Sequence, residues 1–411
     1  MLKYKSNLLK IICIFIIAIF LFPTICIASD TIYTWSNSAK PLTETIPTNA
    51  TTSLSLNVGS AVLIEQNSGQ VLYNQNMHEK LRPASVTKVM TILLIMEAID
   101  SGKLSYTDKI PCSEKAAGMG GSQIWLDVRE ELTVDEMLKA ICVVSANDCT
   151  VAMAEYLAGT EEAFVEQMNS KAKALGMNDT TFKNCHGIDE DGHVTSAYDI
   201  ALMSRELLIK HPSIIKYTTI YMDSLRDGKS SLVNTNKLVR NYKGATGLKT
   251  GSTSIALYNL SASATRNDLS LIAVIMKAPT SPIRFAEVQK LLDYGFNNFE
   301  YKKLANKNDL IKEVSIDKGI ENSVNAILEN DSGVLIQKGQ NKDIVQSMEL
   351  PDSVSAPVSV GQVLGNVTYS LNGNEIGKVN IVAEKSVGKN TAFNMIEHVF
   401  FNWLSLLRYS K

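Results

Sequence analysis

The stretch ASVTKVMTILLIMEA, residues 84–98, decides how the rest of the chain is interpreted. Almost every side chain from Val86 to Met96 is apolar, with no polar stripe at helical spacing, which predicts a helix buried on all sides. Pro83 precedes the stretch, as suits a helix start. Yet Lys88 lies in the first turn, and burial of an unpaired ammonium is costly or lowers its pKa. At positions i and i+3 of a helix, Ser85 and Lys88 would share one face.

Ser85 and Lys88 could form a nucleophile and its base. A serine hydroxyl is a poor nucleophile until its proton is taken, and a lysine can take it when the amine is neutral. Burial beside a second cation favours the neutral amine, and free N–H groups at the helix start favour developing negative charge. Four other Ser-x-x-Lys sequences occur, but none opens an all-apolar helix. Taken alone, the motif is better explained by a capping serine and a snorkelling lysine.

Two further motifs change this interpretation. Ser145-Ala146-Asn147 falls between two helical runs, where a loop can direct both polar side chains inward. Lys249-Thr250-Gly251 occurs once, in a strand-type stretch, and an edge strand with a glycine lets a substrate backbone approach closely. Lys249 is expected to bind a carboxylate and to help keep Lys88 neutral.

Ser-x-x-Lys, Ser-x-Asn and Lys-Thr-Gly in this order are the signature of penicillin-binding proteins and serine β-lactamases. The chain resembles the low-molecular-mass D-alanyl-D-alanine carboxypeptidases from about residue 55 to the C-terminus. The stretches that carry the resemblance are RPASVTKVMT (82–91), HGIDEDGHVTSAYDIA (186–201), TGLKTGST (246–253) and RFAEVQKLLDYGFNNFE (284–300). It implies an α/β catalytic domain, with an antiparallel sheet, helices on both faces and a helical subdomain, followed by a small all-β domain.

The resemblance also implies the catalytic roles. Ser85 would attack the carbonyl between the two terminal D-alanines of a peptidoglycan stem peptide, with Lys88 as the general base. Ser145 and Asn147 would relay protons and hold the substrate amide. Water would then hydrolyse the acyl-enzyme, with no metal or cofactor. β-Lactam antibiotics are expected to bind covalently at the same serine.

The remaining site residues are expected to bind substrate. Lys249 and Thr250 would engage the terminal carboxylate beside Gly251, and Arg284 is a second candidate for that contact. The backbone N–H groups of Ser85 and Ser252 would form the oxyanion hole.

The N-terminus predicts export. Three lysines precede the apolar stretch IICIFIIAIFLFPTICIA at 11–28, and Cys26 and Ala28 are small residues that suit cleavage after Ala28. Residues 1–28 are interpreted as a secretory signal peptide, with an uncleaved membrane anchor as the alternative. The Thr-, Ser-, Asn- and Pro-rich segment 29–55 is expected to be a linker. The protein is therefore predicted to act at the outer face of the cytoplasmic membrane, on the cell-wall side.

Residues 56–298 are predicted to form the catalytic domain. It would begin with a strand hairpin, GSAVLIEQ (59–66) and QVLYNQ (70–75), and continue mostly with helices from about 100 to 215. Strand-type runs return at 217–277, the first being YTTIYM (217–222), and a helix closes the domain at 281–299. Its first and last helices are expected to pack on the sheet.

Two C-terminal segments follow. Short Val- and Ile-rich runs broken by Gly, Asn and Asp predict a separate β-sandwich domain at 299–388. Residues 391–411 predict an amphipathic helix whose wide apolar face suits a bilayer interface, with docking on the protein itself as the alternative. The net charge of −2 provides no electrostatic case for nucleic-acid binding.

Some residues depart from the family pattern. Cys185 stands where relatives often carry proline, and Ser252 where they often carry histidine, tyrosine or phenylalanine. His186 and His193 flank GIDEDG and are expected to be hydrogen-bonding residues of a turn rather than metal ligands. The four cysteines after residue 28 are expected to be small buried thiols: Cys112, Cys142, Cys149 and Cys185.

The sequence leaves three alternatives open. A class A β-lactamase would add Glu-x-x-Leu-Asn, and the nearest match, EQMN at 166–169, is one residue short and lacks the leucine. A wall-binding protein with an inactive site is disfavoured by the intact motifs. Cleavage of peptide cross-links by the same site depends on the room beyond the terminal substrate residue.

Overall fold

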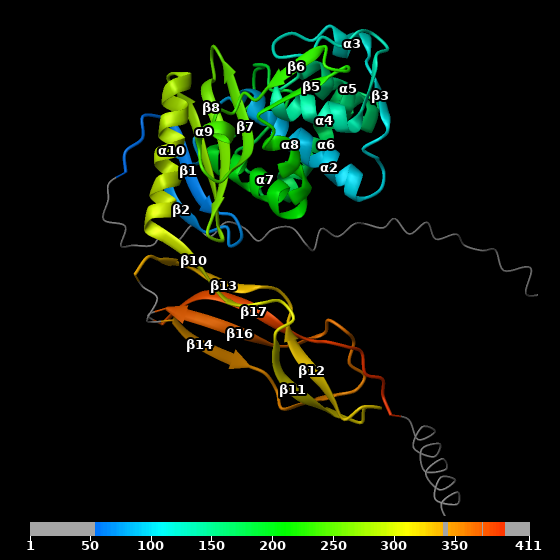
Figure 1. Ribbon diagram of the computed structural model, residues 1–411, viewed down its shortest axis with the longest axis vertical. Helices are drawn as coiled ribbons and strands as arrows, with labels where there is room; N and C mark the ends of the chain where they lie inside the picture. The colour runs from blue at the N-terminus through cyan, green and yellow to red at the C-terminus, as the bar shows by residue number, and fades with distance from the viewer. Residues whose placement is uncertain (1–53, 340–343, 372, 391–411) are drawn as a thin grey trace, which may run out of the picture. The chain divides into compact units, whose positions relative to one another are not determined.

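The computed structural model describes residues 54–339, 344–371 and 373–390 (Figure 1). The predicted signal peptide at 1–28 and C-terminal helix at 391–411 lie outside these residues, as does nearly all of the predicted linker. The catalytic domain contains a five-stranded sheet in the order β2-β1-β9-β8-β7. Its strands are β1 (Ser60–Glu65), β2 (Val71–Gln75), β7 (Ala245–Thr253), β8 (Leu257–Arg266) and β9 (Leu269–Ala278). All neighbouring pairs are antiparallel, and the predicted β1–β2 hairpin is confirmed.

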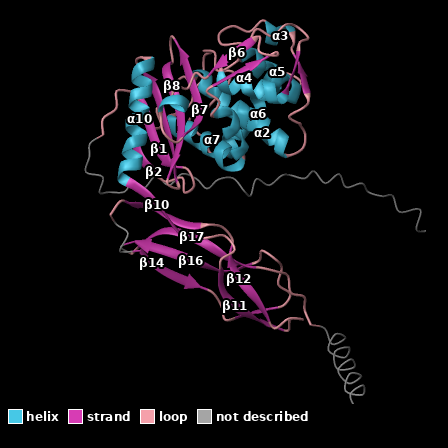
Figure 2. Ribbon diagram, in the orientation of Figure 1, coloured by secondary structure: helices cyan, strands magenta, loops and turns pink. Residues whose placement is uncertain are grey.

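The sheet is covered by helices on both faces, as predicted (Figure 2). Alternation along β9 places Leu271, Ala273 and Ile275 in one hydrophobic cluster with α10 (Ser281–Asn298). The intervening residues Ile272, Val274 and Met276 belong to a second cluster, shared with the helices of the other face. There α7 (Ala197–Lys210) packs on β1 and β9. The period of two along the strand therefore separates two cores.

The helical subdomain surrounds the apolar helix α2 (Lys88–Asp100). This helix contacts α5, α6 and α7 and reaches the sheet at β7, so the prediction that it covers a sheet face is only partly right. On this face α7 instead covers the central strands β1 and β9. The other elements of the subdomain are η1 (Ala84–Thr87), β3 (Lys109–Pro111), α3 (Glu114–Ala117), β4 (Glu131–Thr133), α4 (Val134–Val143), α5 (Asn147–Ala158) and α6 (Glu161–Ala174).

Residues 217–222, predicted as a strand, are mostly not one. The chain forms η2 (Pro212–Ile214) and α8 (Ile215–Thr218), and β5 (Met222–Leu225) begins only at the last residue of the predicted run. Tyr217 is buried and its hydroxyl donates a hydrogen bond to Asp135 of α4, so a tertiary contact outweighs the β-propensity of the run. The elements β6 (Ser230–Val233) and α9 (Leu238–Asn241) complete the domain.

The C-terminal domain is all-β, as predicted. Six strands form one sheet in the order β14-β16-β17-β12-β11-β15, and β10 pairs with β13. The strands are β10 (Phe299–Ala305), β11 (Leu310–Asp317), β12 (Ser323–Leu328), β13 (Ser332–Gln337), β14 (Ile344–Glu349), β15 (Ser353–Ser355), β16 (Val363–Leu371) and β17 (Asn374–Ala383). Alternating residues of β12 and β11, such as Val324 and Val314, build its own core.

The cysteines behave as predicted: all four in the described part of the chain are free and buried. Cys142 lies on α4 and Cys149 on the following helix, α5. Across the described ranges, no helix combines the length and the hydropathy needed to cross a membrane.

Candidate active site

Ser85 lies in the 3₁₀ turn η1, just before α2, rather than in the first turn of the α-helix itself. Ala84 precedes it with a φ of 49°, a left-handed conformation that is strained for alanine. The side-chain amide of Asn259 on β8 donates to the carbonyls of Arg82 and Pro83 and so holds the chain entering this turn. Ser85 itself is half-buried and accessible.

Lys88 is fully buried, with three polar partners around its amine. Its Nζ lies 3.0 Å from Ser85 Oγ, 2.6 Å from Asn147 Oδ1 and 2.7 Å from the carbonyl oxygen of His186. A neutral amine has two hydrogens and one lone pair. The amide and peptide oxygens can only accept, so they take the two hydrogens, and the lone pair is left for the Ser85 hydroxyl.

The electrostatics favour that neutral amine. Burial lowers the pKa of Lys88 well below its ordinary value, and the positive charge of Lys249 lowers it further. Cys185 and Asp148 oppose the shift, with a smaller effect. The expectation that Lys249 helps to keep Lys88 neutral agrees with this arrangement.

Ser145 lies in the loop between α4 and α5, as predicted, whereas Asn147 is the first residue of α5. Asn147 donates from Nδ2 to the carbonyl of Gly120 at 2.7 Å, which leaves its Oδ1 facing Lys88. Ser145 has a φ of 67°, and its buried hydroxyl has no hydrogen-bond partner among the described residues. An unpaired buried hydroxyl is costly, so this group is available to a substrate or a reacting atom.

The Lys-Thr-Gly motif lies on β7, which is an edge strand of the sheet, as predicted. Lys249 is buried and donates to the carbonyl of Thr250, and burial, together with Arg284, lowers its pKa to about 7. The Thr250 hydroxyl lies 2.7 Å from that of Thr235, which the sequence did not single out. Ser252 follows with an exposed side chain.

Gly251 allows β7 to approach the nucleophile turn. A Cβ at this position would lie 2.8 Å from the backbone nitrogen of Val86 and 2.9 Å from that of Ser85. Real Cβ atoms essentially never come this close to other atoms. The glycine is therefore required for the distance between the strand and the turn.

Arg284 is buried on α10 beside β7 and β8. Its guanidinium donates to the carbonyls of Gly251 and Asn259, each at 3.3 Å, and burial lowers its pKa to about 10. These bonds give it a role in supporting β7. Direct contact with a substrate carboxylate stays a prediction.

A loop that the sequence marked only as a turn proves to be one wall of the site. The carbonyl of Cys185 accepts from Thr91 Oγ1 at 2.6 Å, and that of His186 accepts from Lys88. Gly187 has a φ of 92°, and a Cβ there would lie 1.9 Å from the carbonyl oxygen of Ala84. Gly187 in the stretch beginning HGI was the feature of the sequence that could have indicated this contact, because only glycine allows another backbone to approach so closely.

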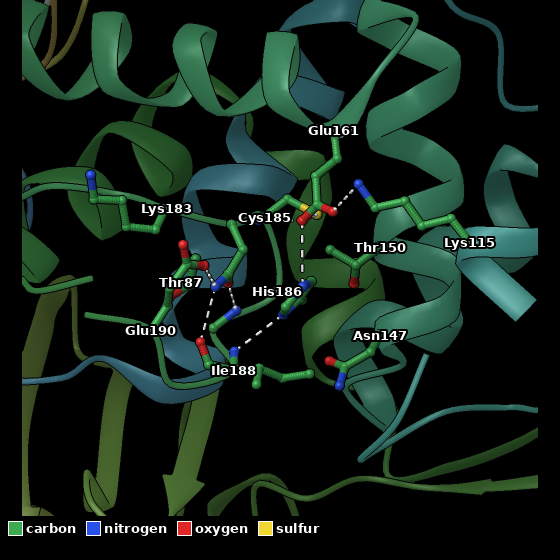
Figure 3. Close-up of polar contacts among 12 residues, drawn as sticks. Thr87, Lys115, Asn147, Thr150, Glu161, Lys183, Cys185, His186, Ile188 and Glu190 are labelled. Atoms are coloured by element: carbon green, nitrogen blue, oxygen red, sulfur yellow. Dashed lines mark hydrogen bonds and ion pairs between the residues drawn. The ribbon is translucent and has the colours of Figure 1, made fainter. Parts of the chain in front are cut away.

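Both histidines of this loop are hydrogen bonded, as predicted, and Figure 3 shows the contacts of His186. His186 Nδ1 accepts from the N–H of Ile188 at 3.1 Å. His193 lies 2.9 Å from Thr87 Oγ1 and accepts from the N–H of Lys183. Among the described residues no group of three or more His, Cys, Asp or Glu side chains is placed to hold a metal.

The comparisons with known proteins agree with this geometry. The family model for D-alanyl-D-alanine carboxypeptidase (peptidase S11) matches residues 47–280, and that for the C-terminal domain of penicillin-binding protein 5 matches residues 299–389. The chain belongs to the D-alanyl-D-alanine carboxypeptidase family. The resemblance inferred from the motifs, the fold class and the serine-type carboxypeptidase activity expected from them are thereby confirmed.

Individual members of the family are similar over most of the chain. D-alanyl-D-alanine carboxypeptidase DacF of Bacillus subtilis is 43% identical over 86% of this chain and 92% of its own length. Penicillin-binding protein 5 from Haemophilus influenzae is 34% identical, covers 82% of this chain and 99% of its own, and superposes with a TM-score of 0.71. Penicillin-binding protein D2 from Listeria monocytogenes, solved in the ampicillin-bound form, is 30% identical over 60% of this chain and all of its own, with a TM-score of 0.55.

The class A β-lactamase alternative finds no support in the family or the site. Glu166 is exposed on α6. Asn169, the other end of the near-match, is tied by its side chain to the backbone of Phe182. These two residues therefore do not reproduce the Glu-x-x-Leu-Asn arrangement that activates a deacylating water.

Proposed function

We propose that this protein removes the terminal D-alanine from peptidoglycan stem peptides through an acyl-enzyme on Ser85. The observation that carries the proposal is the arrangement around Lys88, whose buried Nζ lies within hydrogen-bond distance of two oxygens that can only accept and of the Ser85 hydroxyl. A buried neutral lysine in that position is a general base aimed at one proton.

The reaction follows from the positions of these groups. Lys88 takes the Ser85 proton while Oγ attacks the carbonyl between the two D-alanines. The N–H groups of Ser85 and Ser252 are placed on the two facing elements, η1 and β7, where they would stabilise the oxyanion. The proton taken by Lys88 would reach the leaving amine through the unpaired Ser145 hydroxyl, which gives up its own proton and receives that of Lys88, and water would then hydrolyse the ester.

Substrate recognition is assigned to β7. The ammonium of Lys249 and the hydroxyl of Thr250 would bind the terminal carboxylate, and Thr235 would orient the Thr250 hydroxyl. β-Lactams are proposed to acylate Ser85 in place of the peptide. The ampicillin-bound form of the Listeria relative supports this extension.

We further propose that the protein is exported by the signal peptide at 1–28 and held at the outer face of the cytoplasmic membrane by the helix at 391–411. The sequence patterns of those segments support both statements. Cell fractionation of the full chain and of a chain ending at residue 390 tests the second. Release of the shortened chain from the membrane fraction is expected, and its retention would contradict interfacial anchoring.

An intact-mass time course tests the catalytic proposal. The detergent-solubilised full chain would be mixed with benzylpenicillin, with Ser85→Ala as the control, and D-alanine release from an acylated Lys-D-Ala-D-Ala peptide would be measured in parallel. A lasting penicilloyl adduct and D-alanine release, both lost in Ser85→Ala, are expected. Folded protein without an adduct would favour an inactive wall-binding protein, and rapid penicillin turnover without a lasting adduct would favour a β-lactamase.

A further inference from the structure

Glu161 is a buried carboxylate that the reaction described above does not use. It begins α6, and only 9% of its side chain is exposed. Its carboxylate lies 3.0 Å from Lys115 Nζ of α3 and 3.4 Å from His186 Nε2 (Figure 3). It also accepts from the Cys185 backbone N–H at 3.1 Å and from the Cys185 thiol at 3.3 Å. Three elements therefore meet at this one side chain.

The charge states of Glu161 and His186 are set by burial and by the groups around them. Burial raises the pKa of Glu161, but the hydrogen bonds from Lys115 and from the Cys185 N–H outweigh it and leave the pKa below its ordinary value. Burial lowers the pKa of His186 to about 4, against the raising effect of Glu161. His186 is neutral near pH 7, and because Nδ1 accepts from Ile188, the hydrogen is on Nε2, facing Glu161.

Cys185 and His186 are the two loop residues that Glu161 contacts, through the Cys185 N–H and thiol and the His186 ring. The carbonyl oxygens of the same two residues accept from Thr91 and Lys88 of α2. A shift of this dipeptide would move the acceptor that takes one hydrogen of the Lys88 amine. The lone pair of the amine would then turn away from Ser85.

We propose that Glu161 is a positioning residue that fixes the Cys185–His186 backbone, and through it the orientation and protonation of the general base Lys88. The inference rests on the proposed function, since it assigns Glu161 a part in the same proton transfer. The titratable groups with the largest effect on Lys88 are Lys249 on β7, Cys185 on the loop and Asp148 on α5, and Glu161 adds a weaker negative charge from behind the loop. Those that face Glu161 are Lys115, Cys185 and His186.

The test is the pH dependence of Ser85 acylation by benzylpenicillin, measured on the full chain. Glu161→Gln keeps the shape of the side chain and removes its charge. The plateau rate is expected to fall about tenfold, because sub-ångström errors in a reacting geometry cost at least that much. The acidic limb of the profile is expected to move to lower pH, because loss of a negative charge disfavours the Lys88 ammonium.

Lys115→Met is expected to move the acidic limb in the opposite direction. It removes the positive partner, while the Cys185 N–H and thiol still donate to the Glu161 carboxylate and favour its charged form, so the acidic limb is expected to move to higher pH. Lys115 is 44% exposed on its side chain, so this variant also decides the question if Glu161→Gln does not fold. Glu162→Gln is the matched control, because Glu162 shares Lys115 as its partner but is 75% exposed and does not contact the loop. Its limb is expected to move less than that of Glu161→Gln, and its plateau to stay at the wild-type value.

The proposal is overturned if the limbs of Glu161→Gln and Lys115→Met do not move in opposite directions, or if Glu162→Gln reproduces the plateau loss. A lower plateau with an unmoved limb and a lower Tm would show a purely structural role. Wild-type protein that forms no Ser85 adduct would instead remove the proposed function, which separates the two failures.

Discussion

Gly251→Ala perturbs the close contact between β7 and the nucleophile turn. The new methyl group would lie 2.8 Å from the Val86 nitrogen, about 0.6 Å inside the 3.4 Å at which ordinary van der Waals contact begins. Its three nearest atoms all belong to the backbone of the nucleophile turn or the residue before it, so no flexible side chain can move aside. The strand and the turn must separate by roughly that distance.

Two effects follow from the separation. Acylation of Ser85 is expected to fall by about 10- to 100-fold, because an error near 1 Å in reacting geometry costs about 10² in rate. The free energy of unfolding is expected to fall by about 2 kcal/mol, since overpacking typically costs 1–3 kcal/mol. This corresponds to a drop in Tm of roughly 4–8 °C.

Stopped-flow acylation by a fluorescent penicillin and thermal unfolding would measure both effects. Gly388→Ala is the control, because the nearest atom to a Cβ there is a side-chain carbon at 3.6 Å, an ordinary contact. An acylation rate within twofold of wild type, with an unchanged Tm, would refute the claim that this glycine sets the strand-to-turn distance.

Three further outcomes are expected. Peptide hydrolysis should show a bell-shaped pH profile. The general base must be neutral, while Lys249, whose pKa is lowered to about 7, must be charged to bind a carboxylate. A KM that stays constant from pH 6 to 9 would contradict this expectation. Stability should fall by roughly 2–3 kcal/mol from pH 7 to 5 in urea titrations. Burial lowers the pKa values of His186 and His193 to about 4 in the folded protein, so the unfolded chain binds more protons at these residues as the pH falls. The pKa of Asp199, which burial raises to about 6, offsets part of the loss. A free energy of unfolding that does not change between pH 7 and 5 would contradict these pKa shifts. Lys171→Met should cost about 3–5 kcal/mol in the same titrations, because it leaves the buried Glu206 carboxylate of α7 and the partly exposed Glu97 carboxylate of α2 without their shared cation. A cost below 1 kcal/mol would show that the triad is dispensable.

Local sequence was sufficient wherever one physical requirement dominated. The all-apolar run after Ser85 had to be buried, and it forms α2 inside the helical subdomain. The strand-type run that forms β9 is apolar at consecutive positions, and its two apolar faces match its position in a sheet covered on both sides. The motif order identified the site because three short motifs with different chemistry seldom coincide by chance.

Local sequence failed where a distant contact decided the structure. The β-type run at 217–222 folds otherwise because Tyr217 reaches Asp135 on another helix. The first helix was placed on the sheet, but α7 covers most of that face. The hydrogen bond from Lys88 to the His186 carbonyl spans 98 residues, and nothing near either residue predicts it.

The sequence by itself determined the three motifs, their order, and the α/β and all-β architecture, because residue chemistry and hydrophobic periodicity are local properties of the chain. Only the tertiary structure decided how those groups act. It buried Lys88 beside Lys249, which lowers the pKa of the amine and so favours its neutral form, and it set two oxygens from distant segments around that amine, which would direct its lone pair. The protonation and direction of a buried base depend on what surrounds it, and the surroundings exist only once the chain is folded.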